Sequence, residues 1–166
     1  MYKRLEDVTS YNESFLSTQE ATTLFDYLMG LHKLTNMLEM KIPTGEKVKY
    51  GFGKLMFIDK DLKTNNVFPE PIWGNNMEWS EEMLSIKKRV EDYVGLEFKT
   101  CVCIYYPDGN SGVDYHSDKR AFGDTSVLPS MSLGEERQFN VREISSMKVS
   151  TFVLKHGSLF VMEKGC

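Results

Sequence analysis

The sequence predicts an α+β, mainly β fold, in which an antiparallel barrel or jelly roll occupies the second half and helices pack outside it. Two observations support this. After Gly95 the chain contains five short segments rich in β-forming residues, separated by turn residues. Before Gly95, hydrophobic residues recur at helical intervals. With 166 residues and 41% hydrophobic content, the chain can build one core, so we expect a single domain over residues 1–166.

Two segments of the first half are expected to be helices. The first begins at Ser17, and Glu20 follows three positions later, which is the spacing of a capping box. The second begins at Ser80, carries two glutamates in its first turn and ends at Gly95. These caps define the helices more sharply than the hydrophobic spacing alone.

The rest of the first half is less regular. Residues 47–58 are rich in β-formers but contain Gly51 and Gly53, which indicates a hairpin or a bent strand. Residues 59–79 are dense in Asn, Pro and Gly, so we expect a long surface segment. Its two tryptophans either shape a binding mouth or plug the edge of the core.

The second half is expected to be built from strands. Turn sequences of the types PDGNSG, GEE and HG separate them. The expected strands are residues 98–106, 126–133, 137–143, 150–156 and 158–163.

Composition limits the classes of function. The chain has 20 basic and 24 acidic residues, a net charge of −4, so nucleic-acid binding would need a local basic patch rather than an overall field. Residues 87–89, KKR, are interpreted as a solvated helix face, with a phosphate contact as the alternative. The three cysteines form no even framework, which indicates reduced thiols and a cytoplasmic protein, or a nuclear one in a eukaryote. No membrane span or signal peptide is recognisable.

The stretch DYHSDKR places His116 and Asp118 one residue apart. On a strand, residues i and i+2 point to the same face, so we expect the imidazole and the carboxylate to converge. A non-haem iron(II) site needs two histidines and one carboxylate on one face of the metal. The pair would supply two of these three ligands.

Three segments together resemble a known family. IYYPDGNSGVDYHSD, PSMSLGEERQFNVR and LKHGSLFVM are similar, in order and spacing, to the second half of the AlkB-type iron(II)- and 2-oxoglutarate-dependent dioxygenases. The resemblance is strongest over residues 98–162. It implies a double-stranded β-helix (jelly roll), Fe(II) as the metal and 2-oxoglutarate as co-substrate.

Carried over by position, the resemblance implies that His116 and Asp118 are catalytic iron ligands and that Tyr106 donates to a 2-oxoglutarate carboxylate. Phe139 is expected to pack in the core, and His156, in the HGS turn, is expected to be structural. His32 is interpreted as an ordinary polar residue of the first helix.

The sequence departs from the family pattern at three points. The second metal-binding His of the family, with the Arg that grips 2-oxoglutarate, would lie about 50 to 60 residues after His116, beyond Cys166. We therefore expect either a piece of a longer protein or a natural form without full activity. Ile104 stands where the family has an Asn that contacts the co-substrate. Arg120 stands where nucleic-acid dealkylases place an acidic residue, and it would repel a cationic methylated base.

The resemblance implies oxidative dealkylation of N-methylated bases in DNA or RNA, of the repair type, with nucleic acid as the partner and no membrane. Aromatic residues are candidates to stack on the base. The candidate substrate-binding residues are Arg120, Trp73, Trp79, Tyr50 and Phe52. Alternatives are an oxygenase of the same fold acting on a protein, a lipid or a small molecule, and a non-catalytic binding domain on a degenerate oxygenase fold. A plain β domain with an accidental His-x-Asp pair is disfavoured by the matched strands.

Overall fold

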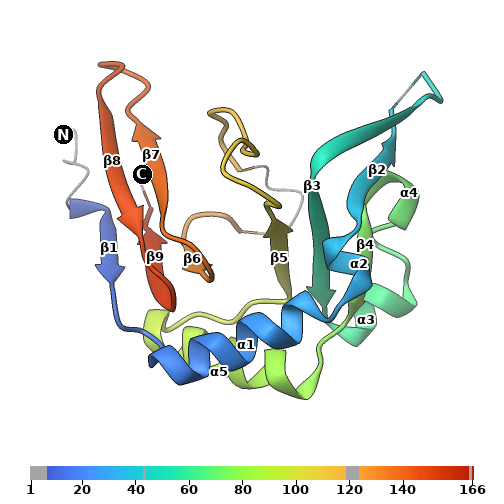
Figure 1. The fold of residues 1–166 in the computed structure, drawn as a ribbon, viewed down its shortest axis with the longest axis horizontal. Helices are drawn as coiled ribbons and strands as arrows, with labels where there is room; N and C mark the ends of the chain where they lie inside the picture. Colours follow the sequence, from blue (N-terminus) through green and yellow to red (C-terminus); the bar gives the residue numbers. More distant parts are fainter. Residues whose placement is uncertain (1–6, 43, 119–123, 165) are drawn as a thin grey trace. The chain divides into compact units, whose positions relative to one another are not determined.

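A computed structural model describes residues 7–42, 44–118, 124–164 and 166. The helices are α1 (Thr18–Met29), α2 (His32–Thr35), α3 (Lys60–Thr64), α4 (Glu70–Trp73) and α5 (Glu81–Val94). The strands are β1 (Thr9–Asn12), β2 (Met37–Lys41), β3 (Lys47–Ile58), β4 (Asn75–Glu78), β5 (Thr100–Tyr105), β6 (Leu128–Ser132), β7 (Arg137–Arg142), β8 (Val149–Leu154) and β9 (Ser158–Met162). The five described helices lie in the first half of the chain, interspersed with β1 to β4, and the described elements after α5 are all strands (Figure 1).

The chain forms two compact units. The terminal unit comprises Met1–Asp26 and Asp114–Cys166, and the middle unit comprises Tyr27–Val113. The expectation of one domain over the whole chain stays a prediction.

In the terminal unit, β9 is the central strand of a three-stranded sheet in the order β1-β9-β6, with both pairings antiparallel. Its central position buries Phe160, which is 1% exposed. The β7–β8 hairpin contributes Phe139 and Phe152, whose ring centroids lie 5.4 and 4.6 Å from that of Phe160. This aromatic cluster holds the hairpin to the unit.

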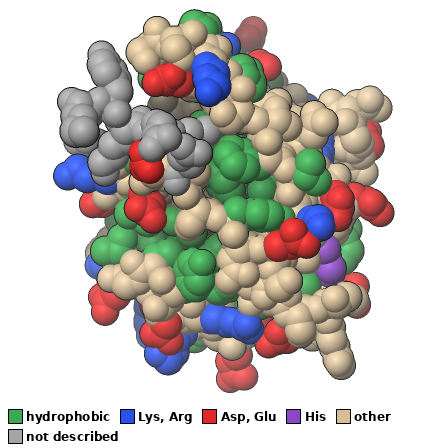
Figure 2. Space-filling view, turned by 90° about the vertical axis from the view of Figure 1, so that its left-hand side faces the viewer, with side chains coloured by type: hydrophobic (Ala, Val, Ile, Leu, Met, Phe, Trp, Pro, Cys, Tyr) green, Lys and Arg blue, Asp and Glu red, His purple; other side chains and the backbone are tan. Residues whose placement is uncertain are grey.

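The opposite face of the β7–β8 hairpin is open. Strand alternation that turns Phe139 and Phe152 inward turns Val149 and Val153 outward, and these are 45% and 47% exposed. Figure 2, which views the molecule from the left-hand side of Figure 1, shows hydrophobic side chains among polar and charged ones on that side. Single exposed apolar side chains of this kind are normal on a protein surface.

In the middle unit, β3 is the organising strand. It pairs antiparallel with β2 and β5 and parallel with β4. Its last four residues, Leu55–Ile58, are at most 1% exposed. Gly53 precedes them, and a Cβ there would lie 1.8 Å from the carbonyl oxygen of Leu34, so only glycine fits. The 47–58 segment is thus one continuous strand rather than a hairpin by itself.

The expected helix caps are confirmed. The backbone N–H of Ser17 donates to Glu20 Oε2 at 2.8 Å, and the N–H of Glu20 donates to Ser17 Oγ at 3.3 Å, which forms the capping box. Ser80 Oγ accepts from the N–H of Met83, and Gly95 ends α5 at a φ of 72°. The positions predicted from the sequence for both long helices are therefore correct.

The expected strands of the second half are confirmed as β5 to β9, and the mainly β composition with helices is confirmed with them. The described strands pair in three separate sheets of three, four and two strands, so a closed barrel is not part of the described pairing. The three cysteines are free, as expected.

Two expectations were wrong. Residues 59–79 are not a long surface loop, because they contain α3, α4 and β4. The β4 segment becomes a strand by pairing with the buried end of β3, a partner distant in sequence. His32 begins the short helix α2 rather than lying on the first helix.

Among the described helices, none combines the length and the hydrophobicity that crossing a membrane requires.

Candidate metal centre and co-substrate site

His116 and Asp118 lie in an irregular segment, which we call the His-x-Asp loop (residues 114–118). The expectation that they share one face of a strand was wrong, since no helix or strand covers this loop. The two side chains nevertheless approach each other, with His116 Nε2 3.7 Å from Asp118 Oδ1. The side chains are 57% and 46% exposed.

The hydrogen bonding of His116 fixes its tautomer. Nδ1 lies 2.7 Å from the carbonyl oxygen of Asp114, which can only accept, so Nδ1 carries the proton and donates. In the neutral ring, Nε2 then carries the lone pair and lies 3.7 Å from Asp118 Oδ1. Two electron donors that face each other in this way are stabilised by a cation between them.

These two donors fit a first-row metal ion. Metal-binding histidines usually donate their second ring N–H to a backbone carbonyl or a carboxylate, as His116 donates to Asp114. Two metal–ligand bonds of about 2.1 Å each can span the 3.7 Å between Nε2 and Oδ1. In the described parts of the chain, no group of three or more His, Cys, Asp or Glu side chains is arranged to hold a metal. The described residues therefore offer a two-donor partial site.

Tyr106 follows the end of β5 in the middle unit and belongs to a row of aromatic rings. Its ring centroid is 6.2 Å from that of Phe52, which lies 5.5 Å from that of Tyr50. All three side chains are half-buried. Ile104, at the position of the family's Asn, is 37% exposed and pairs with Lys54 across β3 and β5. This part of the middle unit thus combines aromatic rings with an apolar side chain.

Trp79 is held by an aromatic ring, a cation and a hydrogen bond. It stacks on Phe57 at 6.1 Å and 26°, and Lys87 Nζ lies 4.8 Å from the ring centroid. Its Nε1–H donates to Asp59 Oδ1 at 2.8 Å, and Lys87 donates to the same oxygen at 3.0 Å. These contacts favour the interpretation of Trp79 as a plug at the edge of the core. They also give Lys87, the first residue of KKR, a structural contact.

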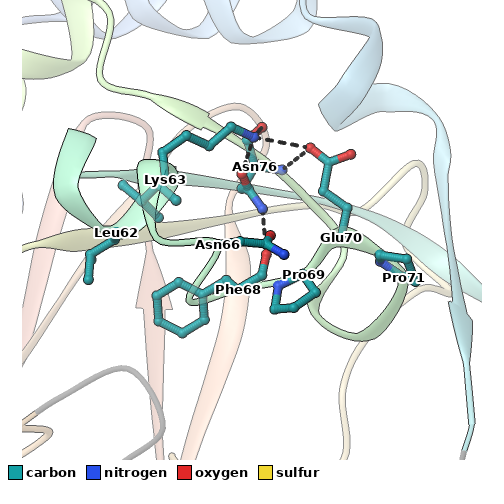
Figure 3. A pocket seen from close by; sticks show the side chains of 9 residues that line it. Leu62, Lys63, Asn66, Phe68, Pro69, Glu70, Pro71 and Asn76 are labelled. Atoms are coloured by element: carbon teal, nitrogen blue, oxygen red, sulfur yellow. Dashed lines mark hydrogen bonds and ion pairs between the residues drawn. The ribbon is translucent and has the colours of Figure 1, made fainter.

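Trp73 packs edge-on against Phe68, with ring centroids 5.5 Å apart. Phe68 in turn lines a cavity of about 480 Å³ in the middle unit (Figure 3). The other lining residues are Ile58, Leu62, Lys63, Asn66, Pro69, Glu70, Pro71 and Asn76. This cavity was not predicted from sequence, because the strand β4 and the short helices that build it were not expected.

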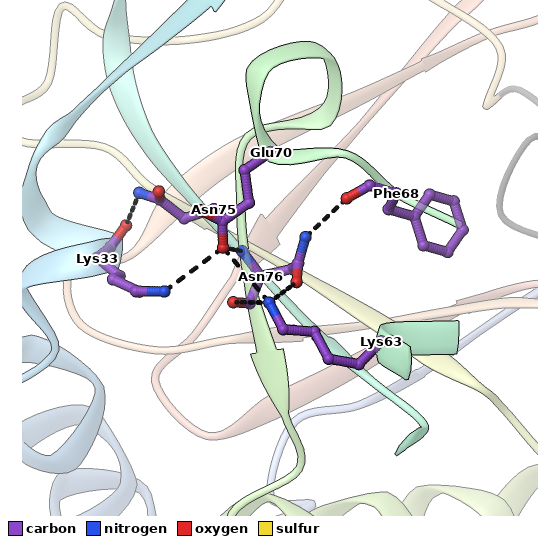
Figure 4. A network of polar contacts seen from close by, with 6 residues as sticks. All are labelled: Lys33, Lys63, Phe68, Glu70, Asn75 and Asn76. Atoms are coloured by element: carbon purple, nitrogen blue, oxygen red, sulfur yellow. Dashed lines mark hydrogen bonds and ion pairs between the residues drawn. The ribbon is translucent and has the colours of Figure 1, made fainter. Parts of the chain in front are cut away.

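A polar network closes one side of this cavity (Figure 4). Asn76 is 3% exposed, accepts from Lys63 through its side-chain oxygen and donates to the carbonyl of Phe68 at 2.8 Å. Glu70 accepts from the N–H of Asn76 at 3.4 Å and pairs with Lys33 and Lys63 at 3.4 and 3.5 Å. Every polar group of Asn76 therefore has a partner inside the protein, which is the pattern of a structural network.

His156 is held within the terminal unit. The N–H of Gly134 donates to Nδ1 at 2.9 Å, and Nε2 lies 3.2 Å from Thr22 Oγ1. The ring also meets Phe25 edge-on at 6.3 Å. These contacts agree with the structural role expected from sequence. Arg120, the remaining candidate, lies outside the described residues.

Comparison with known proteins extends this picture. The sequence profile of the "2OG-Fe(II) oxygenase superfamily" matches residues 9–166. The rat protein named "Alpha-ketoglutarate-dependent dioxygenase alkB homolog 3" is 32% identical over 98 residues, covering 53% of this chain and 33% of the rat protein. The human protein of that name is 30% identical over 98 residues, covering 53% of this chain and 34% of its own length. "Uncharacterized protein R406" of Acanthamoeba polyphaga mimivirus is 28% identical over 81 residues, covering 49% of this chain and 42% of that protein. The chain thus spans about a third of the length of the rat and human relatives.

Proposed function

The chain belongs to the 2OG-Fe(II) oxygenase superfamily, of the AlkB type, and from this we propose that it is part of a dioxygenase that removes methyl groups from nucleic-acid bases. The double-stranded β-helix is the proposed architecture of the complete domain. Nucleic acid as substrate follows from the AlkB resemblance, and single-stranded DNA or RNA would avoid the cost of unstacking a base.

One observation carries the proposal, namely that His116 Nδ1 donates to the Asp114 carbonyl, so that Nε2, 3.7 Å from Asp118 Oδ1, is the ring nitrogen available to a metal ion. In the proposed site these two side chains hold Fe(II), and the Asp114 carbonyl orients the imidazole. Bound Fe(II) with 2-oxoglutarate supplies the activation of dioxygen. The protein supplies orientation and charge.

Tyr106 has a proposed role in binding the co-substrate. Its hydroxyl is an O–H donor, and a 2-oxoglutarate carboxylate is a strong acceptor. Ile104 cannot make the amide contact made by the family's Asn, so a larger share of co-substrate binding falls on other donors. Tyr50 and Phe52, adjacent rings 5.5 Å apart, are the proposed stacking residues for a base.

A second candidate is an oxygenase of the same fold that acts on a protein or a small molecule. Two features favour it: the net charge of −4 disfavours a polyanionic substrate, and the cation at Arg120 disfavours a cationic methylated base. A non-catalytic binding domain is favoured by the two-donor set found in the described residues. Turnover experiments separate these candidates.

The metal site is tested first. Anaerobic addition of Fe(II) and 2-oxoglutarate to the intact protein should give a weak visible charge-transfer band. His116→Ala and Asp118→Ala should abolish the band, because each removes one of two donors 3.7 Å apart, whereas the control His32→Ala on α2 should retain it. An unchanged band in both site variants would remove these residues from the metal site.

Substrate class needs a separate measurement. Methylated oligonucleotides should release formaldehyde in proportion to the 2-oxoglutarate consumed. An intact charge-transfer band without formaldehyde release would favour the second candidate.

A further inference from the structure

Among the described residues, the polar contacts of His116 and Asp118 lie within the His-x-Asp loop itself. His116 bonds to Asp114 and faces Asp118, so both contacts stay inside the loop. Within the described parts of the chain, one side-chain contact joins the loop to a strand, and it involves Tyr115, the residue before His116. The arrangement of the two donors therefore depends on whatever holds Tyr115.

Arg142 makes this contact. Its guanidinium carbon lies 4.1 Å from the centroid of the Tyr115 ring, which is a cation–π distance. Tyr115 is 46% exposed, so water screens the contact only partly and one area of the ring remains open. Arginine suits such a contact because its planar guanidinium can lie flat on an aromatic ring, which a lysine ammonium cannot do.

Arg142 is itself attached to a rigid element. It is the last residue of β7 and pairs with Val149 of β8. Three residues earlier on the same strand, Phe139 packs on Phe160, the most buried aromatic ring of the terminal unit. A continuous path of contacts thus leads from the aromatic core through β7 to the loop.

We propose that Arg142 is a positioning residue, which holds the His-x-Asp loop against β7 by stacking on Tyr115. The part of this inference that concerns metal binding rests on the proposed function. Arg142 does not touch the metal. It restricts the loop, so that less conformational freedom is lost when the two donors bind an ion.

The first experiment measures the loop without any metal. Amide hydrogen exchange over residues 113–118 should become faster in Arg142→Met, which keeps the aliphatic stem but removes the guanidinium. An exposed cation–π contact corresponds to about a two- to fivefold change in the opening equilibrium. Arg142→Lys keeps the positive charge but not the planar guanidinium. Its exchange rate should fall between those of the wild type and Arg142→Met. Lys88→Met on α5, a cation of the middle unit that pairs with Asp92 of the same helix, should leave this exchange unchanged.

The second experiment measures the metal. Co(II), a spectroscopic substitute for Fe(II), should bind Arg142→Met about two- to fivefold more weakly, with an unchanged thermal midpoint. A purely structural role would lower the midpoint and leave the Co(II) affinity of the folded protein unaltered. Tyr115→Phe keeps the ring and should match the wild type, whereas Tyr115→Leu should match Arg142→Met.

A double-mutant cycle decides whether the two residues act as one contact. Arg142→Met combined with Tyr115→Leu should exchange no faster than either single variant. Additive effects, or unchanged exchange in Arg142→Met, would overturn the proposal. If Co(II) fails to bind the wild type, the proposed function fails, while the exchange measurements still decide the role of Arg142.

Discussion

Two histidines of the terminal unit have opposite surroundings. The imidazole of His156 is half-buried and bonded at both nitrogens, with Gly134 N–H donating to Nδ1 at 2.9 Å and Thr22 Oγ1 3.2 Å from Nε2. Because a backbone N–H can only donate, Nδ1 accepts, and in the neutral ring the proton sits on Nε2 and is donated to Thr22. His116 has the reverse arrangement, with Nδ1 donating inward and Nε2 left for an external partner.

This difference separates a structural histidine from a candidate ligand. A metal ion requires a free lone pair on an imidazole nitrogen, and His156 has none to offer while both nitrogens are bonded. The neutral ring of His116 has one on Nε2, which lies 3.7 Å from a carboxylate oxygen of Asp118. The identity of the residue is the same in both cases, so hydrogen-bond direction makes the distinction.

The largest expected effect tests the difference in packing between the surroundings of His156 and those of the His-x-Asp loop. Gly157, beside His156, has a φ of +80°, and a Cβ there would lie 2.9 Å from Ala21 Cβ and 3.2 Å from Leu16 O. Gly157→Ala should therefore lower the free energy of unfolding by about 2–4 kcal/mol, measured by chemical denaturation. Gly112, close to the His-x-Asp loop, has no atom within 4 Å of an added Cβ. Gly112→Ala should stay within about 0.5 kcal/mol of the wild type. Equal effects would contradict the contrast.

The next prediction compares the alanine variants of the two histidines, in stability and in metal binding. His156→Ala leaves the part-buried N–H of Gly134 without its acceptor and should cost about 1–3 kcal/mol in unfolding free energy while retaining metal binding. His116→Ala should do the opposite, with less than about 0.5 kcal/mol lost and metal binding abolished. Denaturation and Co(II) titration on the same samples measure both quantities. Loss of metal binding in His156→Ala without loss of stability would contradict this prediction, because it would indicate that His156 is a metal ligand.

Short-range sequence patterns predicted the ends of the two long helices and the strands of the second half. Ser17 with Glu20, and Ser80 with Gly95, mark helix ends through bonds that span three or four residues, so no tertiary information was needed. The β-rich segments of the second half became strands for a similar reason, since their turns are encoded in short Gly, Asp and Asn sequences.

The features that sequence reasoning missed depend on distant partners. Asn75–Glu78 has few β-formers and became β4 because the buried end of β3 supplied the hydrogen bonds. The strand expected around His116 is a loop, and its contact with Arg142 joins residues that no local pattern connects. The His-x-Asp spacing identified the two residues, but the tautomer that makes His116 a donor required the Asp114 carbonyl.

The smallest expected effect concerns the charged network around Glu70 in the middle unit. Burial by itself would raise the pKa of Glu70, but the N–H of Asn76 and the ammonium groups of Lys33 and Lys63 outweigh it and hold the pKa below 4.5. A carboxyl with a lowered pKa stabilises the folded state above its unfolded pKa, and this stability is lost as the pH falls through the folded value. Because Glu70 is 41% exposed, Glu70→Gln should cost less than about 1 kcal/mol at pH 7 and should flatten the stability profile below about pH 4.5. Denaturation as a function of pH measures this, and Glu78→Gln, at the exposed end of β4, is the control that should keep the wild-type profile. Identical profiles of stability against pH for the two variants would show that the contacts of Glu70 do not stabilise the folded state. Hydrogen-bond partners alone would then not identify a structural network.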